Sequence, residues 1–162
     1  MIRQVTDSDT ATTIDAAEAC GLFTPDELQT LRLQLEKTLS GSSDREEFWL
    51  ADFDEQGRAR GVAYCAAETM TDRVWNLLFL GVRRDEHRKG LGSALLRAVE
   101  QRLSASAQRM LIIETTSGEE FESARSLYLR HGFRLEATLA DFYADGAPKI
   151  VFVKKLAESP VA

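Results

Sequence analysis

The hydrophobic residues of this sequence follow a helical period in some stretches and a strand-like period in others. After "TPDEL", leucines recur every three or four residues, which predicts a helix with one apolar face. Thr24 can cap this helix, Pro25 suits its first position, and Glu27 completes a capping box. The leucines of the apolar face are Leu28, Leu31, Leu35 and Leu39.

From Glu47 onward, short apolar stretches of strand length replace the helical period. "FWLADF" and "GVAYCAA" are typical of two strands joined by the turn "DEQGR", in which Gly57 can adopt a positive φ. The following stretch "RVWNLLFLGV" is hydrophobic on both faces, as expected for a central strand. We therefore expect an antiparallel meander of three strands that leads into the second half of the chain.

The second half alternates helices and strands. A helix from Leu91 to Leu103 precedes the buried strand "RMLIIETT", and "FESARSLYLRHGF" predicts a helix that ends at Gly132. "RLEATLADFY" and "KIVFVKKL" predict a closing hairpin around an Asp-Gly turn. With "IRQVT" as a first strand and a helix from Asp7 to Gly21, the order is β-α-α-β-β-β-α-β-α-β-β, a mixed α/β fold.

The composition fits one globular domain in the cytoplasm. The 162 residues suffice for one hydrophobic core, and the only linker-like stretch, "SGSSD", is too short to separate domains. A net charge of −6 argues against a nucleic-acid partner. No stretch is apolar enough to span a membrane or resembles a signal peptide, so no membrane partner is expected. Two cysteines and two histidines show no metal-ligand spacing, so no metal site and no disulfide scaffold are expected.

A basic loop between the central strand and the next helix is the first candidate site. In "LFLGVRRDEHRKGLGSALL", neither a Walker-type loop nor a dinucleotide fingerprint is complete, since Leu95 replaces the third glycine of the latter. A shorter cradle is possible, in which the amides from His87 to Ser93 converge on a pyrophosphate at the helix N-terminus. Gly90 and Gly92 would allow the backbone to approach the phosphates closely. The alternative is a plain strand-to-helix turn with solvated basic residues.

Two motifs resemble those of the GNAT superfamily of N-acetyltransferases. "VRRDEHRKGLGSALL" is similar to its acetyl-CoA-binding motif, [QR]-x-x-G-x-[GA], and "ARSLYLRHGF" to its following motif, A-x-x-x-Y-x-x-x-G-F. His87 stands where the family has Gln or Arg, and Arg88 where Gly is frequent. The order of the elements agrees from Glu47 to Leu156, about two-thirds of the chain.

The resemblance implies a GNAT-like fold and acetyl transfer from acetyl-CoA, a co-substrate, to a primary amine. The expected sheet is mixed and largely antiparallel, with about six to seven strands and helices on both faces. Residues 1–162 would form a single domain, with an acetyl-CoA-binding core at about 47–156 and a helical wall of the acceptor site at about 7–40. The implied cofactor-binding residues are Leu80, Val82, His87, Arg88, Lys89, Gly90, Leu91, Gly92, Ser93, Arg125 and Tyr128.

The resemblance also implies catalytic roles for three side chains. Tyr128 lies at the family's general-acid position, where a phenol can protonate the departing thiolate. Glu114, at the end of an apolar strand, is the first candidate for the base, because burial raises the pKa of a carboxyl group. Glu68 is the alternative base or a contact for the amine. Core packing for Tyr128 and ordinary strand-end roles for the carboxylates are the competing interpretations, and a water chain can replace a side-chain base.

The resemblance also implies a role for a backbone amide, whereas it leaves the acceptor undefined. The Val82 amide would stabilise the oxyanion, as implied by the family. Asp141 and Tyr143 could contact a cationic substrate, although a role in the hairpin is the simpler interpretation. The acceptor stays open among small amines, amino acids, antibiotics and protein amines, in a monomer or homodimer. The alternative functions are a catalytically silent acyl-CoA-binding module and an acyltransferase that prefers longer chains.

Overall fold

A computed structural model describes residues 1–156 and divides them into two compact units. Unit 1 comprises Met1–Ala67 and Phe79–Val99, and unit 2 comprises Glu68–Leu78 and the described chain from Glu100 onward. Strand β4 (Val74–Val82) and helix α3 (Leu91–Ala105) therefore each contribute residues to both units.

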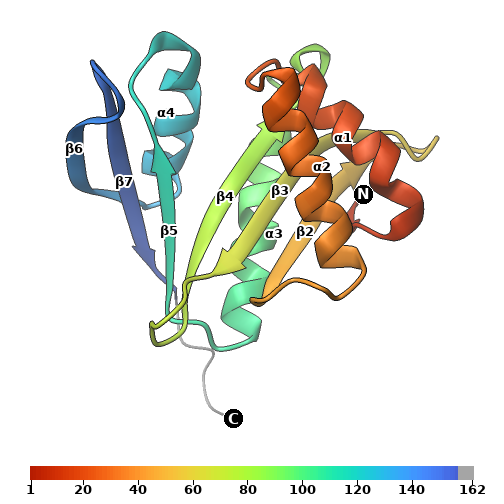
Figure 1. Ribbon diagram of the computed structural model, residues 1–162, viewed down its shortest axis with the longest axis horizontal. Helices are drawn as coiled ribbons and strands as arrows, with labels where there is room; N and C mark the ends of the chain where they lie inside the picture. Colours follow the sequence, from red (N-terminus) through yellow and green to blue (C-terminus); the bar gives the residue numbers. More distant parts are fainter. Residues whose placement is uncertain (157–162) are drawn as a thin grey trace. The chain divides into compact units, whose positions relative to one another are not determined.

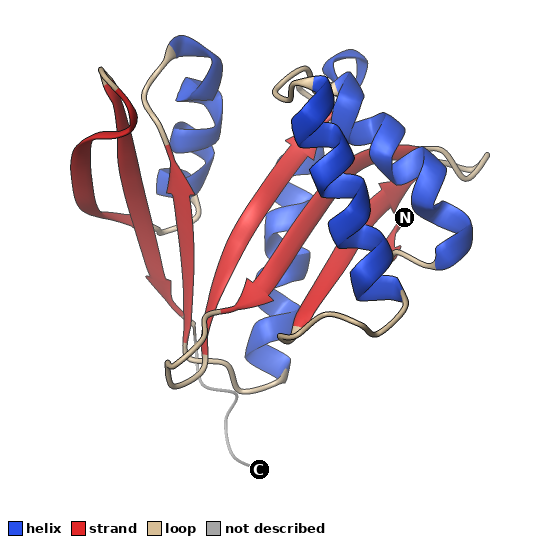
Figure 2. Cartoon of the chain, in the orientation of Figure 1, coloured by secondary structure: helices blue, strands red, loops and turns tan. Residues whose placement is uncertain are grey.

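The elements follow the order predicted from the sequence (Figures 1 and 2). Seven strands are hydrogen-bonded in the order β1-β2-β3-β4-β5-β7-β6, and the β4–β5 pair is parallel. The predicted fold class is confirmed as a mostly antiparallel mixed sheet with four α-helices. The strands are β1 Ile2–Gln4, β2 Glu47–Phe53, β3 Ala59–Ala67, β4 Val74–Val82, β5 Met110–Thr115, β6 Arg134–Ala144 and β7 Ala147–Lys155. The α-helices are α1 Thr10–Ala19, α2 Pro25–Leu39, α3 Leu91–Ala105 and α4 Glu122–Arg130, and the 3-10 helices are η1 Asp7–Asp9, η2 Arg84–Glu86 and η3 Glu119–Phe121.

In unit 1, helices cover both faces of the strands. Successive residues of a strand point to opposite faces, and Gly61 and Val62 of β3 show this alternation. A Cβ at Gly61 would lie 2.9 Å from Leu95 of α3, whereas Val62 belongs to the core beneath α1 and α2. Figure 1 shows α1 and α2 on one face of β2 and β3 and α3 on the other.

The core of unit 1 forms where the apolar faces of α1 and α2 meet β2 and β3. Leu35 is completely buried, and Trp49 stacks on Tyr64 with 4.2 Å between the ring centroids. The predicted capping box is confirmed at the start of α2. The Thr24 hydroxyl accepts from the Glu27 amide at 3.3 Å, and the Glu27 carboxylate accepts from the Thr24 amide at 2.7 Å.

A buried carboxylate fixes the N-terminal segment of unit 1. Asp9 accepts two hydrogen bonds from the Arg3 guanidinium, at 2.6 and 2.8 Å, and further ones from the amide and hydroxyl of Thr6. The Arg3 hydrogen bond is the main reason that the pKa of Asp9 lies far below its usual range. These contacts form η1, so that the predicted helix at Asp7 begins as a 3-10 turn.

Unit 2 is built on β5, which pairs with β4 on one side and with β7 on the other. The parallel pairing with β4 covers three residue pairs, from Val74↔Met110 to Asn76↔Ile112. Trp75 is buried, and its indole donates to the Gln108 side chain at 2.9 Å. The closing hairpin of β6 and β7 turns at Gly146, which has a φ of 75°.

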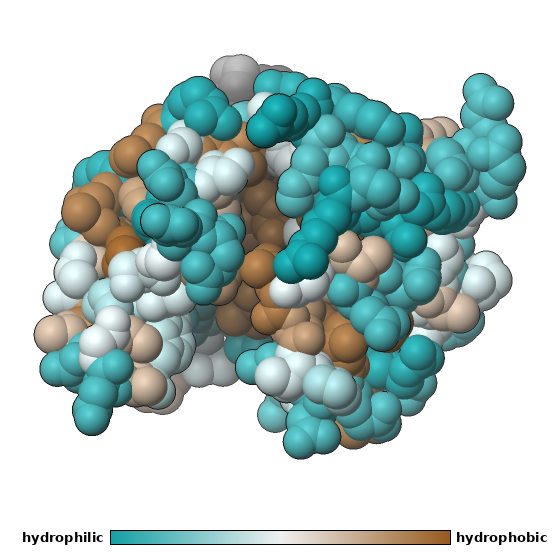
Figure 3. All heavy atoms as spheres, turned by 90° about the horizontal axis from the view of Figure 1, so that it is seen from above, coloured by the Kyte–Doolittle hydropathy of each residue, from teal (hydrophilic) through white to brown (hydrophobic). Residues whose placement is uncertain are grey.

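The surface of the described chain carries both polar and apolar residues. Figure 3 shows one face on which hydrophilic residues predominate, with hydrophobic residues between them. Within residues 1–156, no helix has both the length and the hydrophobicity that crossing a bilayer requires. The same residues contain no cluster of three or more His, Cys, Asp or Glu that could hold a metal ion.

Candidate functional site

The loop that joins β4 to α3 in unit 1 has the backbone conformation of a cradle. Arg88 and Gly90 both adopt the left-handed conformation, with φ values of 63° and 75°. The Ala94 amide donates to the Gly90 carbonyl at 3.0 Å, so that α3 begins directly after this glycine. The first amides of a helix have no acceptor inside the helix. The amides of Leu91, Gly92 and Ser93 can therefore bind an anion.

The left-handed Arg88 explains why glycine is frequent at this position in the family that the motif resembles. A side chain makes this conformation unfavourable by about 1 kcal/mol, whereas glycine adopts it freely. Arg88 thus keeps the loop's path at some cost in backbone energy. Its guanidinium forms no ion pair within residues 1–156, and the side chain is exposed.

The His87 side chain contacts the end of β4. Its Nε2 lies 2.9 Å from the carbonyl oxygen of Val82, at the end of β4. The imidazole therefore closes the loop back onto the strand. Leu80 and Val82 themselves are half-buried on β4, and the Val82 backbone is held in this way close to the cradle.

Acidic residues hold several of the basic side chains around the loop. Lys89 pairs with Glu86 at 2.8 Å, and Arg58 pairs with Glu86 at 3.3 Å and with Asp85 at 2.7 Å. Lys89 is the main reason that the pKa of Glu86 is lowered. Arg83 pairs with Asp15 of α1 at 2.5 Å. These ion pairs fix the loop's shape, so that binding of an anion would rely mainly on backbone amides.

Sequence reasoning missed two residues of this loop region. Glu86 is buried and accepts from two cations, which makes it the anchor of the network. Arg97 lies one helical turn after Ser93 and donates to its hydroxyl at 3.1 Å, which adds a positive charge at the start of α3. The spacing of four residues between Ser93 and Arg97 is the signal that could have identified it.

The remaining predicted site residues belong to unit 2, and Tyr128 is the most buried of them. Its residue surface is 5% exposed, and its ring lies 6.1 Å from Phe133 and 5.7 Å from Phe152 between centroids. Burial raises the pKa of Tyr128 to about 12. The phenol therefore remains protonated across the physiological range, as a proton donor must.

Glu114 lies in a less apolar environment than the sequence suggested. Its side chain is 29% exposed and forms an ion pair with Lys149 at 2.9 Å. The Lys149 ammonium also lies 4.5 Å from the centre of the Phe142 ring. Burial is therefore not the only influence on Glu114, because Lys149 on a strand that is distant in sequence supplies a cation.

Glu68 and Arg125 have structural partners of their own within unit 2. The Glu68 carboxylate accepts from Asn76 at 2.8 Å, and this asparagine is 2% exposed. Arg125 donates to the carbonyls of Thr116 and Gly118, at 2.9 and 3.1 Å, which fixes the segment after β5. These contacts give Glu68 and Glu114 separate partners.

The two hairpin residues considered for substrate contact differ in their setting. Asp141 has a φ of 53°, and its carboxylate accepts from the Gly146 amide at 2.7 Å. This bond supports the turn of the β6–β7 hairpin, as the simpler interpretation held. Tyr143 is half exposed and packs edge-on against Phe142, with 5.0 Å between the centroids.

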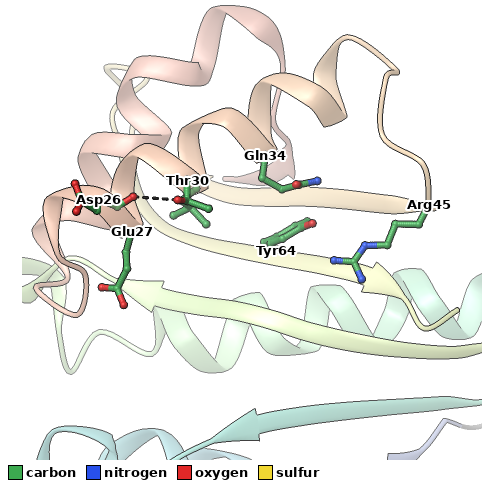
Figure 4. A pocket seen from close by; sticks show the side chains of 7 residues that line it. Asp26, Glu27, Thr30, Gln34, Arg45 and Tyr64 are labelled. Carbon is green, nitrogen blue, oxygen red and sulfur yellow. Dashed lines mark hydrogen bonds between the residues drawn. The ribbon is translucent and has the colours of Figure 1, made fainter. Parts of the chain in front are cut away.

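A pocket of about 370 Å³ lies in unit 1 between α2 and β3 (Figure 4). Asp26 and Glu27 stand at one end, Arg45 stands at the other, and the Tyr64 ring lies between them. Such a volume suits a small-molecule ligand. The lining residues are Asp26, Glu27, Thr30, Leu31, Gln34, Arg45 and Tyr64.

A buried carboxylate, Glu47, organises the Arg45 end of the pocket. It accepts hydrogen bonds from the Tyr64 hydroxyl at 2.6 Å, from the Gln34 amide at 2.9 and 3.0 Å, and from the Thr38 hydroxyl. Burial alone would raise the pKa of Glu47, but these hydrogen bonds outweigh it and lower the pKa. The Arg45 Nε lies 3.9 Å from the same carboxylate.

The chain is similar to known acetyltransferases in sequence and in fold. Residues 44–135 match a family model described as an acetyltransferase (GNAT) domain, which covers more than half of the chain. No curated protein matches the sequence. Among solved structures, a GNAT-family protein from Desulfovibrio desulfuricans is 25% identical, with a TM-score of 0.88, and the match covers 97% of this chain and 99% of that one.

Two further solved structures share the fold at lower identity. The ribosomal-protein-S18-alanine N-acetyltransferase from Escherichia coli is 17% identical, with a TM-score of 0.76 over 100% of this chain and 98% of that one. A phosphinothricin acetyltransferase from Sinorhizobium meliloti, in complex with acetyl-CoA, is 19% identical, with a TM-score of 0.74 over 100% and 91%.

Proposed function

Because the chain belongs to the GNAT family of acetyltransferases, we propose that it transfers the acetyl group of acetyl-CoA to a primary amine by direct attack. The observation that carries this proposal is the loop of unit 1, where left-handed Arg88 and Gly90 lead into the N-terminus of α3. This backbone lies within the stretch that matches the family.

The cradle would bind the pyrophosphate of acetyl-CoA. The amides from Arg88 to Ser93 fit this group because they combine a left-handed turn with the positive end of a helix, whereas the His87 amide already donates to the Arg84 carbonyl at 3.4 Å. Arg88 and Arg97 add positive charge, whereas the Lys89 ammonium is paired with Glu86. Gly90 leaves space, since a Cβ built on it meets no atom within 4 Å. Leu80, Leu91, Gly92 and Arg125 complete the proposed binding set.

The reaction needs one bond to form and one to break at the acetyl carbonyl carbon. The neutral amine attacks this carbon, and a C–N bond forms while the carbonyl oxygen takes up negative charge. The Val82 amide is proposed to stabilise that oxyanion. When the intermediate collapses, the C–S bond breaks and the electron pair leaves with the sulfur. Tyr128 is proposed to donate its proton to this thiolate, and the proton that the attacking nitrogen must lose to become an amide restores the phenol through water.

The amine must lose its proton to carry out the attack. Glu114 and Glu68 are both proposed as acceptors for this proton, either directly or through water. Their partners differ, since Glu114 faces the Lys149 ammonium and Glu68 faces the neutral Asn76 amide. Replacement of each by glutamine, with a pH profile of kcat/KM, distinguishes the two. Only the replacement of the residue that acts as the base should remove the acidic limb of the kcat/KM profile.

Thermal unfolding with and without ligand tests the proposed function. We expect acetyl-CoA at about one hundred times its Kd to add about 2.7 kcal/mol of stability, which raises Tm by about 5 °C. ATP and NAD serve as controls and should leave Tm unchanged. Absence of a shift at millimolar acetyl-CoA would contradict the cradle. A shift without acetylation of any amine would instead identify a silent acyl-CoA-binding module.

A further inference from the structure

The pocket between α2 and β3 carries opposite charges at its two ends, and this polarity indicates a class of acceptor. We propose that it binds an acceptor that carries a primary amine and a carboxylate about 10 Å apart, as a short peptide does. The amine would lie at Asp26 and Glu27, and the carboxylate at Arg45. The inference rests on the proposed function, because it assigns the acceptor of that reaction.

The acidic end of the pocket lies on the side of the cradle. The turn before α2 contacts the end of β4, since the Phe23 and Phe79 rings pack edge-on at 4.9 Å between centroids. Arg84 of the cradle loop donates to the Gly21 carbonyl in the same turn, at 3.4 Å. α2 starts four residues after Gly21 and presents Asp26 to the pocket. An ammonium bound there would be the reactive group.

The basic end of the pocket lies where β2 begins and β3 ends. Arg45 precedes β2, whose first residue, Glu47, pairs with Ala66 near the end of β3. In Figure 4 the Arg45 guanidinium points into the pocket beside the Tyr64 hydroxyl. Its Nε faces Glu47 at 3.9 Å, which is long for an ion pair. A guanidinium in this position is suited to bind a carboxylate through two parallel hydrogen bonds.

The distance between the two ends sets the length of the acceptor. Gln34 marks the basic end of the pocket, because it donates to Glu47 and the same carboxylate faces Arg45. Asp26 and Gln34 are eight residues apart on α2, which corresponds to about 12 Å along the helix. An extended chain of three residues spans about 10 Å. Leu31 and the Tyr64 ring line the middle of the pocket, where apolar contacts can hold the backbone of such a chain. Asp26 and Arg45 therefore suit the two charged ends of a tripeptide.

Matched peptides and variants test this assignment. The probes are triglycine, triglycinamide (which lacks only the carboxylate charge) and hexylamine, each with acetyl-CoA. We expect the wild type to acetylate triglycine with a kcat/KM at least 10-fold above that for triglycinamide. Arg45→Met should remove this preference and leave triglycinamide within 2-fold of wild type, whereas Arg45→Lys should keep part of it. Arg32→Met, on α2 outside the pocket, should leave both values unchanged.

The possible outcomes distinguish a failure of this inference from a failure of the proposed acetyltransferase function. Equal rates on the two peptides in the wild type, or acetylation of hexylamine but of neither peptide, would overturn the inference and leave the acetyltransferase function intact. An equal loss on both peptides in Arg45→Met would overturn it too, since Arg45 would then only support Glu47. If no amine is acetylated, the proposed function and the inference both fail.

Discussion

At the scale of single residues, Tyr128 shows how one side chain can satisfy both a packing and a chemical interpretation. Its ring lies between two phenylalanines, as a core residue would. The same burial raises the pKa of the phenol to about 12 and keeps its proton available. A substitution that removes only the hydroxyl separates the two roles, because phenylalanine preserves the ring.

Replacement of Tyr128 by phenylalanine should lower kcat strongly and change stability little. We expect a loss of about 10²-fold or more, the usual contribution of a general acid, because the thiolate would leave without a proton. Steady-state CoA release measures kcat, and urea unfolding measures stability. Tyr143→Phe, at an exposed position, is the control. Unchanged turnover in Tyr128→Phe would contradict the proposed general acid.

The residues also show where sequence reasoning was sufficient and where it failed. The capping pair Thr24 and Glu27 could be predicted because both partners lie three residues apart, and the contact is local. The Glu114–Lys149 pair could not, since it joins β5 to a strand 35 positions later in the chain. Side-chain pairs between distant strands depend on the register, which the sequence pattern does not contain.

At the scale of elements, the junction of β4, its loop and α3 carries the proposed binding of acetyl-CoA. The hydrophobic pattern predicted both elements, and the motif predicted the cradle between them. The left-handed conformation of Arg88 could not be predicted, because a non-glycine residue rarely adopts it. The ion pairs that fix the loop, such as Arg58 with Asp85, also required the tertiary structure.

Replacement of Gly90 by alanine should weaken acetyl-CoA binding at least 10-fold. Its φ of 75° becomes strained with a Cβ, and the added methyl group occupies space beside the proposed pyrophosphate. Gly57→Ala is a matched control, because its φ is 79° and its Cβ also meets no atom within 4 Å. Both variants should lose about 1 kcal/mol of stability. Calorimetric titration with acetyl-CoA should find an affinity loss in Gly90→Ala alone, and equal affinities would argue against the cradle.

At the scale of the whole molecule, the predicted element order is found in full, and two compact units share β4 and α3. The sequence pattern could not indicate this division, because the boundary falls inside a continuous strand and a continuous helix. In unit 1, the buried Asp9 ties the N-terminal strand to the start of α1.

Replacement of Asp9 by asparagine should lower the free energy of unfolding by about 2 kcal/mol at pH 7, since charged hydrogen bonds to Arg3 and Thr6 are lost. The folded-state pKa of Asp9 lies below the unfolded value of about 3.9. The wild type therefore holds this stabilisation above about pH 4 and loses it as the pH falls further. Urea unfolding from pH 7 to pH 2 should show the two proteins converge. Asp7→Asn, at an exposed position, is the control, and a constant difference across this range would contradict the assignment.

The central claim is that this protein moves an acetyl group from acetyl-CoA to a primary amine. The most direct measurement follows free CoA and the acetylated amine together, by thiol assay and mass spectrometry, over a panel of amines and peptides. We expect equal molar amounts of CoA and N-acetyl product with at least one acceptor, and strongly reduced amounts with Tyr128→Phe. Binding of acetyl-CoA without any acetylated product, or release of CoA with free acetate as the only product of the acetyl group, would contradict the claim.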